Sequence, residues 1–298
     1  MNKLNKIFKE SKKIQIDDNT KIVIMSDCHR GVGDNCDNFL KNKNIFHAAL
    51  NHYYDKGFIY IELGDGDDMW EIKKYEEIID EHIDTFKLLK KFHDNNRLIM
   101  IYGNHDICKR NKKVLEKYFY NYYNKLEKKK KDLLKDLIVY EAIVLNYNDN
   151  EIFMIHGHQV DIFNGTTWFL ARFLVRNIWH HLENLGIKDP TTRGMKNYKI
   201  ISKTDKKLKR WSKKNGKIII AGHTHRSVFP KNFDSLYFND GCCIHPNGIS
   251  CLEIENGYIT LVKWEFKLNK DNLLSVERIV VEEKISILNL LTLLKNRQ

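Results

Sequence analysis

Five apolar runs in this 298-residue chain each end in a cluster of Asp, His, Asn and Gly residues, and this pattern constrains the fold most strongly. Early in the chain, the runs alternate with longer stretches whose apolar residues recur every three or four positions. We expect strands over residues 22–25, 58–63 and 97–102, and helices over residues 37–54 and 75–92. Such alternation of strands and helices predicts an α/β domain around a buried sheet.

The second half of the chain predicts antiparallel additions to this sheet. We expect further strands over residues 138–146, 151–155, 217–220, 249–255 and 258–266. The last two flank Asn256-Gly257, a dipeptide that is typical of tight hairpins. Residues 163–215 have a mainly helical pattern that interrupts the strands and predicts a helical insert. Since no low-complexity linker divides the sequence, we expect residues 1–298 to form a single domain that carries this insert.

Polar clusters follow five of the predicted strands. In chain order they are Asp27-Cys28-His29, Gly64-Asp65-Gly66-Asp67-Asp68, Gly103-Asn104-His105-Asp106, His156-Gly157-His158 and Gly222-His223-Thr224-His225. In open α/β sheets, ligands bind beyond the carboxyl ends of the strands, and glycines there let the backbone turn tightly. We therefore expect the five clusters to converge on one site.

The residue types in these clusters favour a pair of metal ions. Carboxylates, imidazoles and one amide oxygen suit Mn²⁺, Fe, Zn²⁺ or Co²⁺, whereas Ca²⁺ prefers a cage of oxygens and Mg²⁺ keeps more water. About seven donors exceed what a single four- or six-coordinate ion accepts, but they fit two ions that share a carboxylate. Two ions roughly 3.5–4 Å apart can stabilise both the attacking and the leaving oxygen of a displacement at phosphorus.

The ordered motifs D-x-H, G-D-x-x-D, G-N-H-D, H-G-H and G-H-x-H resemble those of the calcineurin-like metallophosphoesterase superfamily. They extend over residues 27–225, and all five follow the order of that family. The resemblance implies a four-layer α/β/β/α sandwich with a dinuclear metal site at the strand ends. It also implies an enzyme that hydrolyses phosphate mono- or diesters, in which a hydroxide bridging the two ions attacks phosphorus in line.

The resemblance further implies a role for each motif residue. The metal ligands would be Asp27, His29 and His225 for the first ion, Asp65 as the bridge, and Asn104, His156 and His223 for the second ion. His105 would face the scissile phosphate, stabilise charge and protonate the leaving oxygen. Asp106 would orient His105, and Asp68 would support the bridging carboxylate. Two divalent ions are expected, and Mn²⁺ is favoured, with Fe, Zn²⁺ or Co²⁺ as alternatives.

Five residues beside the ligands have roles that the motifs leave open. Arg30 and Arg226 each follow a metal motif directly and are candidates for binding substrate phosphate, because arginine can donate two parallel hydrogen bonds to it. A salt bridge with a neighbouring acid is the alternative for both. His158 either faces the substrate or supports the metal ligands. Cys28 is expected to pack into the sheet, and Asp67 is expected to be exposed.

The charge balance favours anionic partners. The chain has 50 Lys and Arg residues against 39 acids, a formal net charge of +11. A phosphate-ester substrate fits this excess; nucleic acid is an alternative that we do not favour, because the lysines of residues 128–131 and 206–214 are expected on solvated helix faces. The six cysteines include no CxxC pair and residues 1–13 include no apolar signal segment, so a cytoplasmic location is expected. Residues 285–294 are too short and too polar to span a bilayer.

Two alternative functions remain open at this point. The aromatic stripe over residues 168–179 of the insert predicts core packing or, alternatively, a substrate cap or a peripheral membrane contact. An insert after H-G-H is similar to that of UDP-diacylglucosamine pyrophosphohydrolases, which cleave a lipid-linked diphosphate at the membrane, although that branch has arginine at the position of His105. A non-catalytic binding scaffold on the same fold is an alternative of another class. The sequence specifies no oligomeric state.

Overall fold

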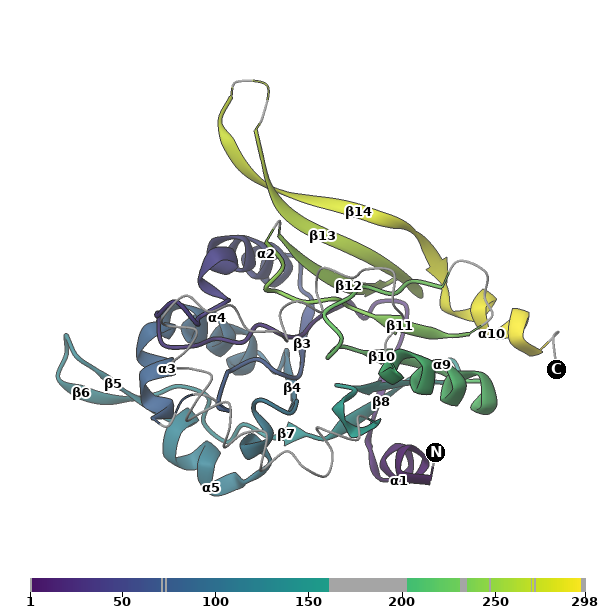
Figure 1. Cartoon of the computed structure of the whole chain (residues 1–298), viewed down its shortest axis with the longest axis horizontal. Coiled ribbons are helices and arrows are strands. Elements are labelled where there is room, and N and C mark those ends of the chain that lie inside the picture. The colour runs from purple at the N-terminus through teal and green to yellow at the C-terminus, as the bar shows by residue number, and fades with distance from the viewer. Residues whose placement is uncertain are drawn as a thin grey trace.

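The computed structural model describes residues 2–70, 72, 74–160, 203–230, 235–246, 248–268, 270 and 272–295. The strands of this part of the chain form a seven-stranded sheet, a five-stranded sheet and a separate two-stranded hairpin. Figure 1 shows the two large sheets stacked on each other with helices on their outer sides. The predicted α/β class is confirmed.

The seven-stranded sheet carries the first three predicted strands at its centre. Its order is β14 (Leu274–Ser286), β13 (Tyr258–Leu268), β12 (Ile249–Glu255), β2 (Ile22–Met25), β3 (Ile59–Leu63), β4 (Leu98–Ile101) and β7 (Val139–Tyr140). Strands β2, β3, β4 and β7 are parallel, whereas β12, β13 and β14 are antiparallel additions. The mixed sheet that the sequence predicted is therefore present. Beyond the sheet, β13 and β14 continue as a two-stranded arm (Figure 1).

The five-stranded sheet brings the later motifs next to the earlier ones. Its order is β1 (Lys12–Ile16), β8 (Ala142–Tyr147), β9 (Asn150–Ile155), β10 (Ile218–Ala221) and β11 (Tyr237–Asn239). Strands β9, β10 and β11 are parallel to one another, so the two later motifs leave the sheet at the same edge. The separate hairpin consists of β5 (Asn121–Asn124) and β6 (Lys129–Asp132).

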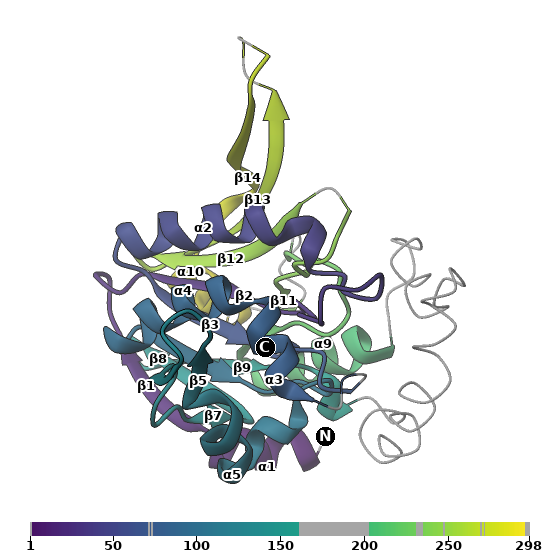
Figure 2. The ribbon, with the colours of Figure 1, turned by 90° about the vertical axis from the view of Figure 1, so that its left-hand side faces the viewer.

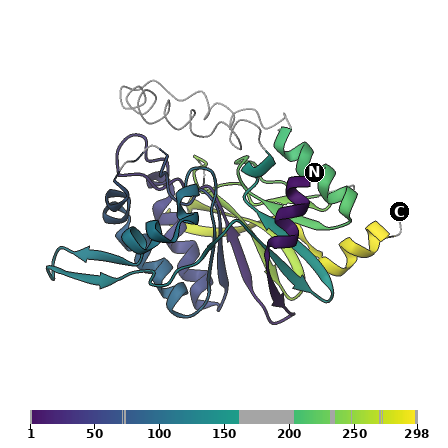
Figure 3. The same cartoon turned by 90° about the horizontal axis from the view of Figure 1, so that it is seen from below.

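Helices cover the outer faces of both sheets, as Figures 2 and 3 show. The helices are α1 (Asn2–Glu10), α2 (Lys43–Asp55), α3 (Tyr75–Glu81), α4 (Ile83–Asp94), α5 (Lys112–Val114), α9 (Lys203–Asn215) and α10 (Ile287–Lys295). Short helical turns lie at Leu40–Asn42, Ile107–Arg110, Leu115–Phe119 and His158–Val160. The helix predicted over residues 75–92 is divided at His82, whose buried ring lies 2.8 Å from the carboxylate of Asp37.

Three apolar cores separate the four layers, and β2 shows how the sequence builds them. Its Val23 and Met25 side chains join the core under α2 and α4, whereas Ile22 and Ile24 join the core between the two sheets. Successive side chains of a strand point to opposite faces, so a strand of four apolar residues is typical of a sheet that is covered on both sides. The third core includes Trp211 of α9 and lies under α1 and α9. This arrangement is the α/β/β/α sandwich that the motifs predicted.

Two predictions about lysine-rich segments have different outcomes. Residues 206–214 lie in α9 as expected, but residues 129–131 belong to strand β6 rather than to a helix. The reason is pairing across the hairpin, where Tyr122 lies opposite Lys131 and Tyr123 opposite Lys130. Most of the predicted insert, from residue 163 to residue 202, lies outside the described residues, so the insert and its aromatic stripe stay predictions.

The C-terminal apolar run forms α10, whose Ile287 and Leu290 are buried at the edge of the core between the sheets. These residues of the run therefore contribute to packing of the core. Within the described ranges, no helix is long and apolar enough to cross a membrane.

Candidate functional site

The five polar clusters lie in loops at one edge of the two stacked sheets. The clusters that begin at Asp27, Gly64 and Gly103 follow β2, β3 and β4, and those that begin at His156 and Gly222 follow β9 and β10. Neighbouring loops are tied by backbone hydrogen bonds from Asp27 N to the Gly64 carbonyl (3.0 Å) and from His29 N to the Asp65 carbonyl (2.9 Å). The predicted convergence of the clusters is confirmed.

Most of the predicted metal ligands have a left-handed backbone. The φ angles are 53° at Asp27, 49° at His29, 51° at Asp65, 68° at His223 and 52° at His225. Each such conformation costs on the order of 1–3 kcal/mol for a residue with a Cβ, and it persists only where the surroundings enforce it. Strain of this kind at several strand ends turns the side chains into the same small volume, and it is typical of functional sites.

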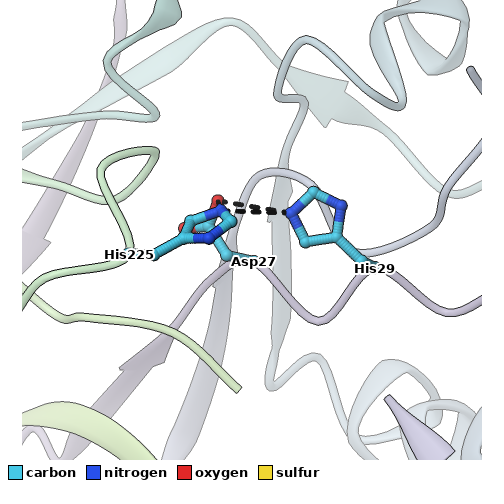
Figure 4. A group of neighbouring side chains, drawn as sticks. All are labelled: Asp27, His29 and His225. Carbon is cyan, nitrogen blue, oxygen red and sulfur yellow. Dashed lines mark hydrogen bonds and ion pairs between the residues drawn. The ribbon is translucent and has the colours of Figure 1, made fainter. Parts of the chain in front are cut away.

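The side chains form overlapping groups that are compact enough to hold cations. Asp27, His29 and His225 form one group, Asp65, His156 and His223 form another, and His29, Asp65 and His105 connect the two. Within each group the potential ligand atoms lie within 4.8 Å of one another. Figure 4 shows the first group, with the imidazoles of His29 and His225 beside the Asp27 carboxylate. We call the seven predicted ligands the ligand cluster: Asp27, His29, Asp65, Asn104, His156, His223 and His225.

Donor atoms in this cluster face one another in a way that fits bound cations. Asp27 Oδ1 lies 3.1 Å from His225 Nε2, Asp65 Oδ2 lies 3.1 Å from His156 Nε2, and His29 Nε2 lies 3.3 Å from His225 Nε2. Ligands bonded at about 2.1 Å to a common ion are separated by about 3.0–3.4 Å, the edge of an octahedron or a tetrahedron. The spacing therefore suits ions such as Mn²⁺ or Zn²⁺.

Asn104 provides a separate indication of a cation. Its Oδ1 atom is buried and has no hydrogen-bond partner among the described residues. Leaving a buried polar atom without a partner costs about 1–3 kcal/mol, which a metal bond at that atom would offset. The motif glycine before it is also explained, because a Cβ on Gly103 would lie 2.0 Å from Asp65 Oδ1.

Hydrogen bonds behind the ligands leave the correct atoms free for metal. Nδ1 of His156 lies 2.8 Å from the carbonyl of Leu63, so it donates there and Nε2 faces Asp65. On Asp27, Oδ2 accepts hydrogen bonds from Ser26 Oγ and from His223 N, which leaves Oδ1 toward the imidazoles. Such contacts fix the orientation of a metal ligand.

The electrostatics of the cluster also favour positive charge. Burial raises the pKa of Asp27, but the facing His225 and His156 outweigh burial and hold it well below its usual range. Asp65 behaves in the same way beside His156 and His105. Burial lowers the pKa of His156, yet the carboxylates of Asp65 and Asp27 outweigh burial and raise it to about 10. Two buried carboxylates thus retain their negative charge and attract protons or metal ions.

A sequence model of the family described as calcineurin-like phosphoesterase matches residues 20–227 of the chain. The chain belongs to the calcineurin-like phosphoesterase family. No curated protein matches the sequence.

The solved structures that match this chain have low sequence identity to it. Vacuolar protein sorting 29 from Cryptosporidium parvum is 14% identical, covers 89% of this chain and 98% of its own, and has a TM-score of 0.41. A predicted phosphoesterase from Streptococcus pneumoniae is 14% identical, with coverages of 88% and 97% and a TM-score of 0.33. A cold-active protein-tyrosine phosphatase from a Shewanella species is 13% identical, with coverages of 91% and 83% and a TM-score of 0.40. Similarity at this level does not identify a substrate.

His105 is held beside the ligand cluster by three neighbours. Its Nδ1 atom lies 3.1 Å from Asp68 Oδ1, its ring is stacked on Trp70 with centroids 4.6 Å apart, and the ring of His29 packs edge-on at 4.5 Å. The side chain is 22% exposed. The carboxylate in contact with the imidazole is therefore that of Asp68, not that of Asp106 as the resemblance implied.

Asp106 instead belongs to a buried group of charges beneath the metal loops. Its carboxylate accepts hydrogen bonds from the backbone of Gly103 (2.7 Å) and Gly66 (3.2 Å) and from the ammonium of Lys109 (2.7 Å). It thus ties the loop after β4 to the loop after β3. The prediction that Asp106 orients the imidazole of His105 is therefore wrong, because its carboxylate holds the backbone of these loops and Lys109 instead.

Arg30 lies in the same group and is not brought to the ligand cluster as a phosphate-binding side chain. Its side chain is fully buried, with two hydrogen bonds to Glu62 (2.8 and 2.9 Å) and one to Asp67 (2.5 Å). Asp67 is also buried and lies 2.7 Å from Lys109, so the expectation that it is exposed was wrong. A buried guanidinium requires paired acids, and Glu62 and Asp67 supply them. The ionic network, as we call it, consists of Arg30, Glu62, Asp67, Asp106 and Lys109.

The other predicted neighbours lie close to the site in different environments. Arg226 donates a hydrogen bond to Asp205 of α9 (2.8 Å) and is 22% exposed, so the predicted salt bridge is present and a phosphate contact stays a prediction. His158 is buried beside His156 and His223, and burial lowers its pKa well below the usual range. A neutral imidazole that supports the ligands fits this position better than one that faces substrate. Cys28 is buried in the core under α2, as predicted.

Three residues near the site were missed by the sequence reasoning. Glu62 is a charged residue inside an apolar strand, which is a signal that it needs a buried partner. Lys109 follows the G-N-H-D motif by three positions but has no local feature that sets it apart from the other lysines of the chain. Trp70 ends the run Gly-Asp-Gly-Asp-Asp-Met-Trp, and only the structure reveals its stacking on His105.

Proposed function

We propose that this phosphoesterase hydrolyses phosphate mono- or diesters with two divalent cations, of which Mn²⁺ is favoured. The observation that carries the proposal is that six of the seven ligands, all except Asn104, come from the ends of β2, β3, β9 and β10 and form groups whose donor atoms lie within 4.8 Å. We assign Asp27, His29 and His225 to one ion. Residues His156, His223 and Asn104 are assigned to the other ion, with Asp65 between the two.

The donor set supports this assignment. Imidazole nitrogens and carboxylate oxygens match Mn²⁺, Fe, Zn²⁺ and Co²⁺, and none of the six free cysteines belongs to the groups of potential ligands. When bound, two such ions supply acidification of water and neutralisation of charge at phosphorus. The protein supplies fixed ligand positions, since the loops are held by the hydrogen bonds and buried charges beneath them.

His105 is the side chain that we assign to the leaving group. Its Nδ1 contacts Asp68, which leaves Nε2 as the atom that meets the substrate. Asp68 stabilises the protonated imidazole, and the Trp70 ring limits rotation of the His105 ring. Transfer of the Nε2 proton to the leaving oxygen then avoids expulsion of an alkoxide, and the imidazole is reprotonated from solvent.

The test is a panel of phosphate compounds assayed with and without Mn²⁺. The panel contains 4-nitrophenyl phosphate, bis(4-nitrophenyl) phosphate, a nucleoside diphosphate and an acylated nucleotide-sugar diphosphate. We expect hydrolysis of a mono- or diester that EDTA abolishes and Mn²⁺ restores. A chain that binds no divalent ion and hydrolyses none of these compounds would be a binding scaffold. Strong preference for the acylated diphosphate would instead make it a lipid-linked pyrophosphohydrolase.

A further inference from the structure

A second carboxyl group, Asp240, lies behind the metal ligand Asp27. It directly follows strand β11 and therefore stands at the same edge of the sheets as the metal loops. The side chains of Ser26, Asp27 and Asp240 are all fully buried. Ser26 lies between the two acids, with its Oγ atom 2.5 Å from Asp27 Oδ2 and 2.8 Å from Asp240 Oδ1.

The number of protons shared by the side-chain oxygens of Asp27, Ser26 and Asp240 determines whether Asp240 is protonated. A serine hydroxyl has a single proton, so it can donate to one of the two carboxylates but not to both. The second contact therefore needs a proton that resides on Asp27 or on Asp240. On Asp27, Oδ2 already accepts the backbone N–H of His223 (2.9 Å) and Oδ1 faces the imidazoles of the ligand cluster. A proton there would occupy a metal-binding position.

Asp240 is the better site for the proton. Its Oδ2 atom has no hydrogen-bond partner in the described ranges of the chain, and the charge of His156 offsets its burial only in part. A buried carboxylate without a cation is costly, whereas a buried carboxylic acid that donates one hydrogen bond is not. Burial, and after it the charge of Asp27, raises the pKa of Asp240 well above its usual range.

We propose that Asp240, as a neutral acid, is a positioning residue for the metal ligand Asp27. Asp240 donates to Ser26 Oγ, and Ser26 donates to Asp27 Oδ2, so that Oδ1 is directed to the metal position. A hydroxyl that accepts one hydrogen bond donates a stronger one. This role rests on the proposed function, because it concerns one of the two proposed ion sites.

The packing around Ser26 leaves little room for another arrangement. A Cβ on Gly222 would lie 2.3 Å from Ser26 Oγ and 2.8 Å from Asp27 Oδ2. Gly222 therefore allows the loop after β10 to pack directly against the side chains of Ser26 and Asp27. The backbone of Asp27 is left-handed, so its side chain depends on such contacts for its direction.

The experiment is a calorimetric titration of Mn²⁺ into the metal-free full chain and four variants. We expect Ser26→Ala and Asp240→Ala to weaken one of the two binding steps about 10- to 100-fold, as is usual when a group behind a metal ligand is removed. Asp240→Asn should stay within about threefold of the wild type, because its amide N–H can donate to Ser26 as the acid does. Ser212→Ala is the matched control. Ser212 is also buried, and its Oγ bonds the Lys217 carbonyl (2.9 Å) and Leu236 N (3.0 Å) away from the metal loops.

Each outcome decides a different point. If Asp240→Asn weakens binding as much as Asp240→Ala, the acid is charged and the proposal is overturned. Should Ser26→Ala and Asp240→Ala bind both ions like the wild type, the hydrogen bonds from Asp240 through Ser26 to Asp27 have no positioning role. If Asp240→Ala does not fold, the contrast between Ser26→Ala and Asp240→Asn decides the point alone. A wild type that binds no divalent ion contradicts the proposed function itself, whereas unchanged binding by every variant contradicts only this role.

Discussion

Two clusters of buried charge meet at the loops after β2, β3 and β4, and only one of them has its acids paired with a guanidinium and an ammonium. In the ionic network, the carboxylates of Glu62 and Asp67 meet the guanidinium of Arg30 and the ammonium of Lys109. In the ligand cluster, the ion pairs of Asp27 and Asp65 within the described residues are with imidazoles, and several donor atoms point at one another. The acids of the network thus meet cations of the chain, whereas the ligand cluster is where we propose that divalent cations bind.

The titration of the two clusters shows the same difference. In the network, burial raises the pKa of Asp67, but Arg30 and Lys109 outweigh burial and lower it to about 2, while the surrounding acids raise the pKa of Lys109. Asp67 and Lys109 thus stay charged through the physiological range, whereas burial raises the pKa of Asp106. In the ligand cluster, the raised pKa of His156 places a proton where a metal ion would bind. We therefore expect metal ions to exchange with protons in the ligand cluster and not in the ionic network.

The largest expected effect comes from Asp65→Asn, which removes the carboxylate shared by the groups of ligands. We expect the rate of ester hydrolysis to fall by at least about 10³-fold, because metal and transition-state stabilisation are lost together. Metal content measured by mass spectrometry should fall from two ions per chain toward one or none.

The control for this variant is Asp94→Asn, an exposed acid at the end of α4 that pairs only with Lys90 among the described residues. It should keep both the ions and the rate. If Asp65→Asn retains two ions and the wild-type rate, Asp65 does not bridge them, and the contrast between the two clusters fails.

His105→Ala tests whether the imidazole beside the cluster acts on substrate rather than on metal. We expect kcat to fall about 10²- to 10⁴-fold, the usual contribution of a general acid, while metal content is unchanged. The loss should be smaller for esters with a good leaving group, such as 4-nitrophenyl phosphate, than for alkyl phosphates. An unchanged rate with alkyl phosphates would remove His105 from the proposed mechanism.

Arg30→Met tests the claim that the ionic network is balanced by the chain itself. It leaves Glu62 and Asp67 buried with a single cation, Lys109, and we expect a loss of about 3–5 kcal/mol in the free energy of unfolding. Denaturant titrations should give the same loss in EDTA and in Mn²⁺, because the network holds no metal. Lys90→Met, which breaks an exposed pair, should cost less than about 1 kcal/mol. A loss that appears only with Mn²⁺ would assign Arg30 to the metal site after all.

The sequence predicted the ligand cluster more completely than the ionic network, and the reason is physical. The predicted metal ligands each lie directly after the end of a strand. The spacing of residues within each motif is therefore a local feature that the sequence alone reveals. The network depends on contacts between distant positions, such as Arg30 with Glu62 and Asp106 with Gly66. Local patterns do not determine which acid pairs with which base. For this reason Arg30 was expected at the substrate and Asp67 in solvent.

The same limit applies to the fold. The apolar strands and amphipathic helices were predicted because burial imposes a period on each of them. Strand β14 was not predicted, since charged residues such as Arg278 and Glu282 interrupt its apolar pattern at the edge of the sheet. The lysines of β6 were assigned to a helix because only pairing with β5 determines their conformation.

The pH dependence of metal binding separates the clusters further. The folded-state pKa of His156 in the metal-free protein, about 10, lies above the unfolded value of about 6.5. Its protonation therefore stabilises the metal-free fold fully below pH 6.5, and this contribution is lost as the pH rises through 10. Because Mn²⁺ must displace that proton, its affinity should rise about tenfold per pH unit between pH 7 and 8.5. Titrations in buffers of different ionisation enthalpy would detect the released proton, and a pH-independent affinity would contradict the assignment of His156.

The smallest expected effect concerns Trp70, whose ring stacks on His105. Trp70 follows Asp65 and Asp67 in the chain segment after β3. Stacking of aromatic rings contributes about 0.5–1.5 kcal/mol, so Trp70→Leu should lower kcat about two- to twelvefold. Trp70→Phe keeps a ring against the imidazole and should stay closer to the wild type. Neither variant should change the metal content, and neither should change the loss in the free energy of unfolding that Arg30→Met causes. The reason is that we expect the stacking contact to act on the ring of His105. A fall in metal content with Trp70→Leu would show instead that Trp70 supports the ligand cluster. Trp70 would then belong with the residues that hold the metal ligands and not with His105.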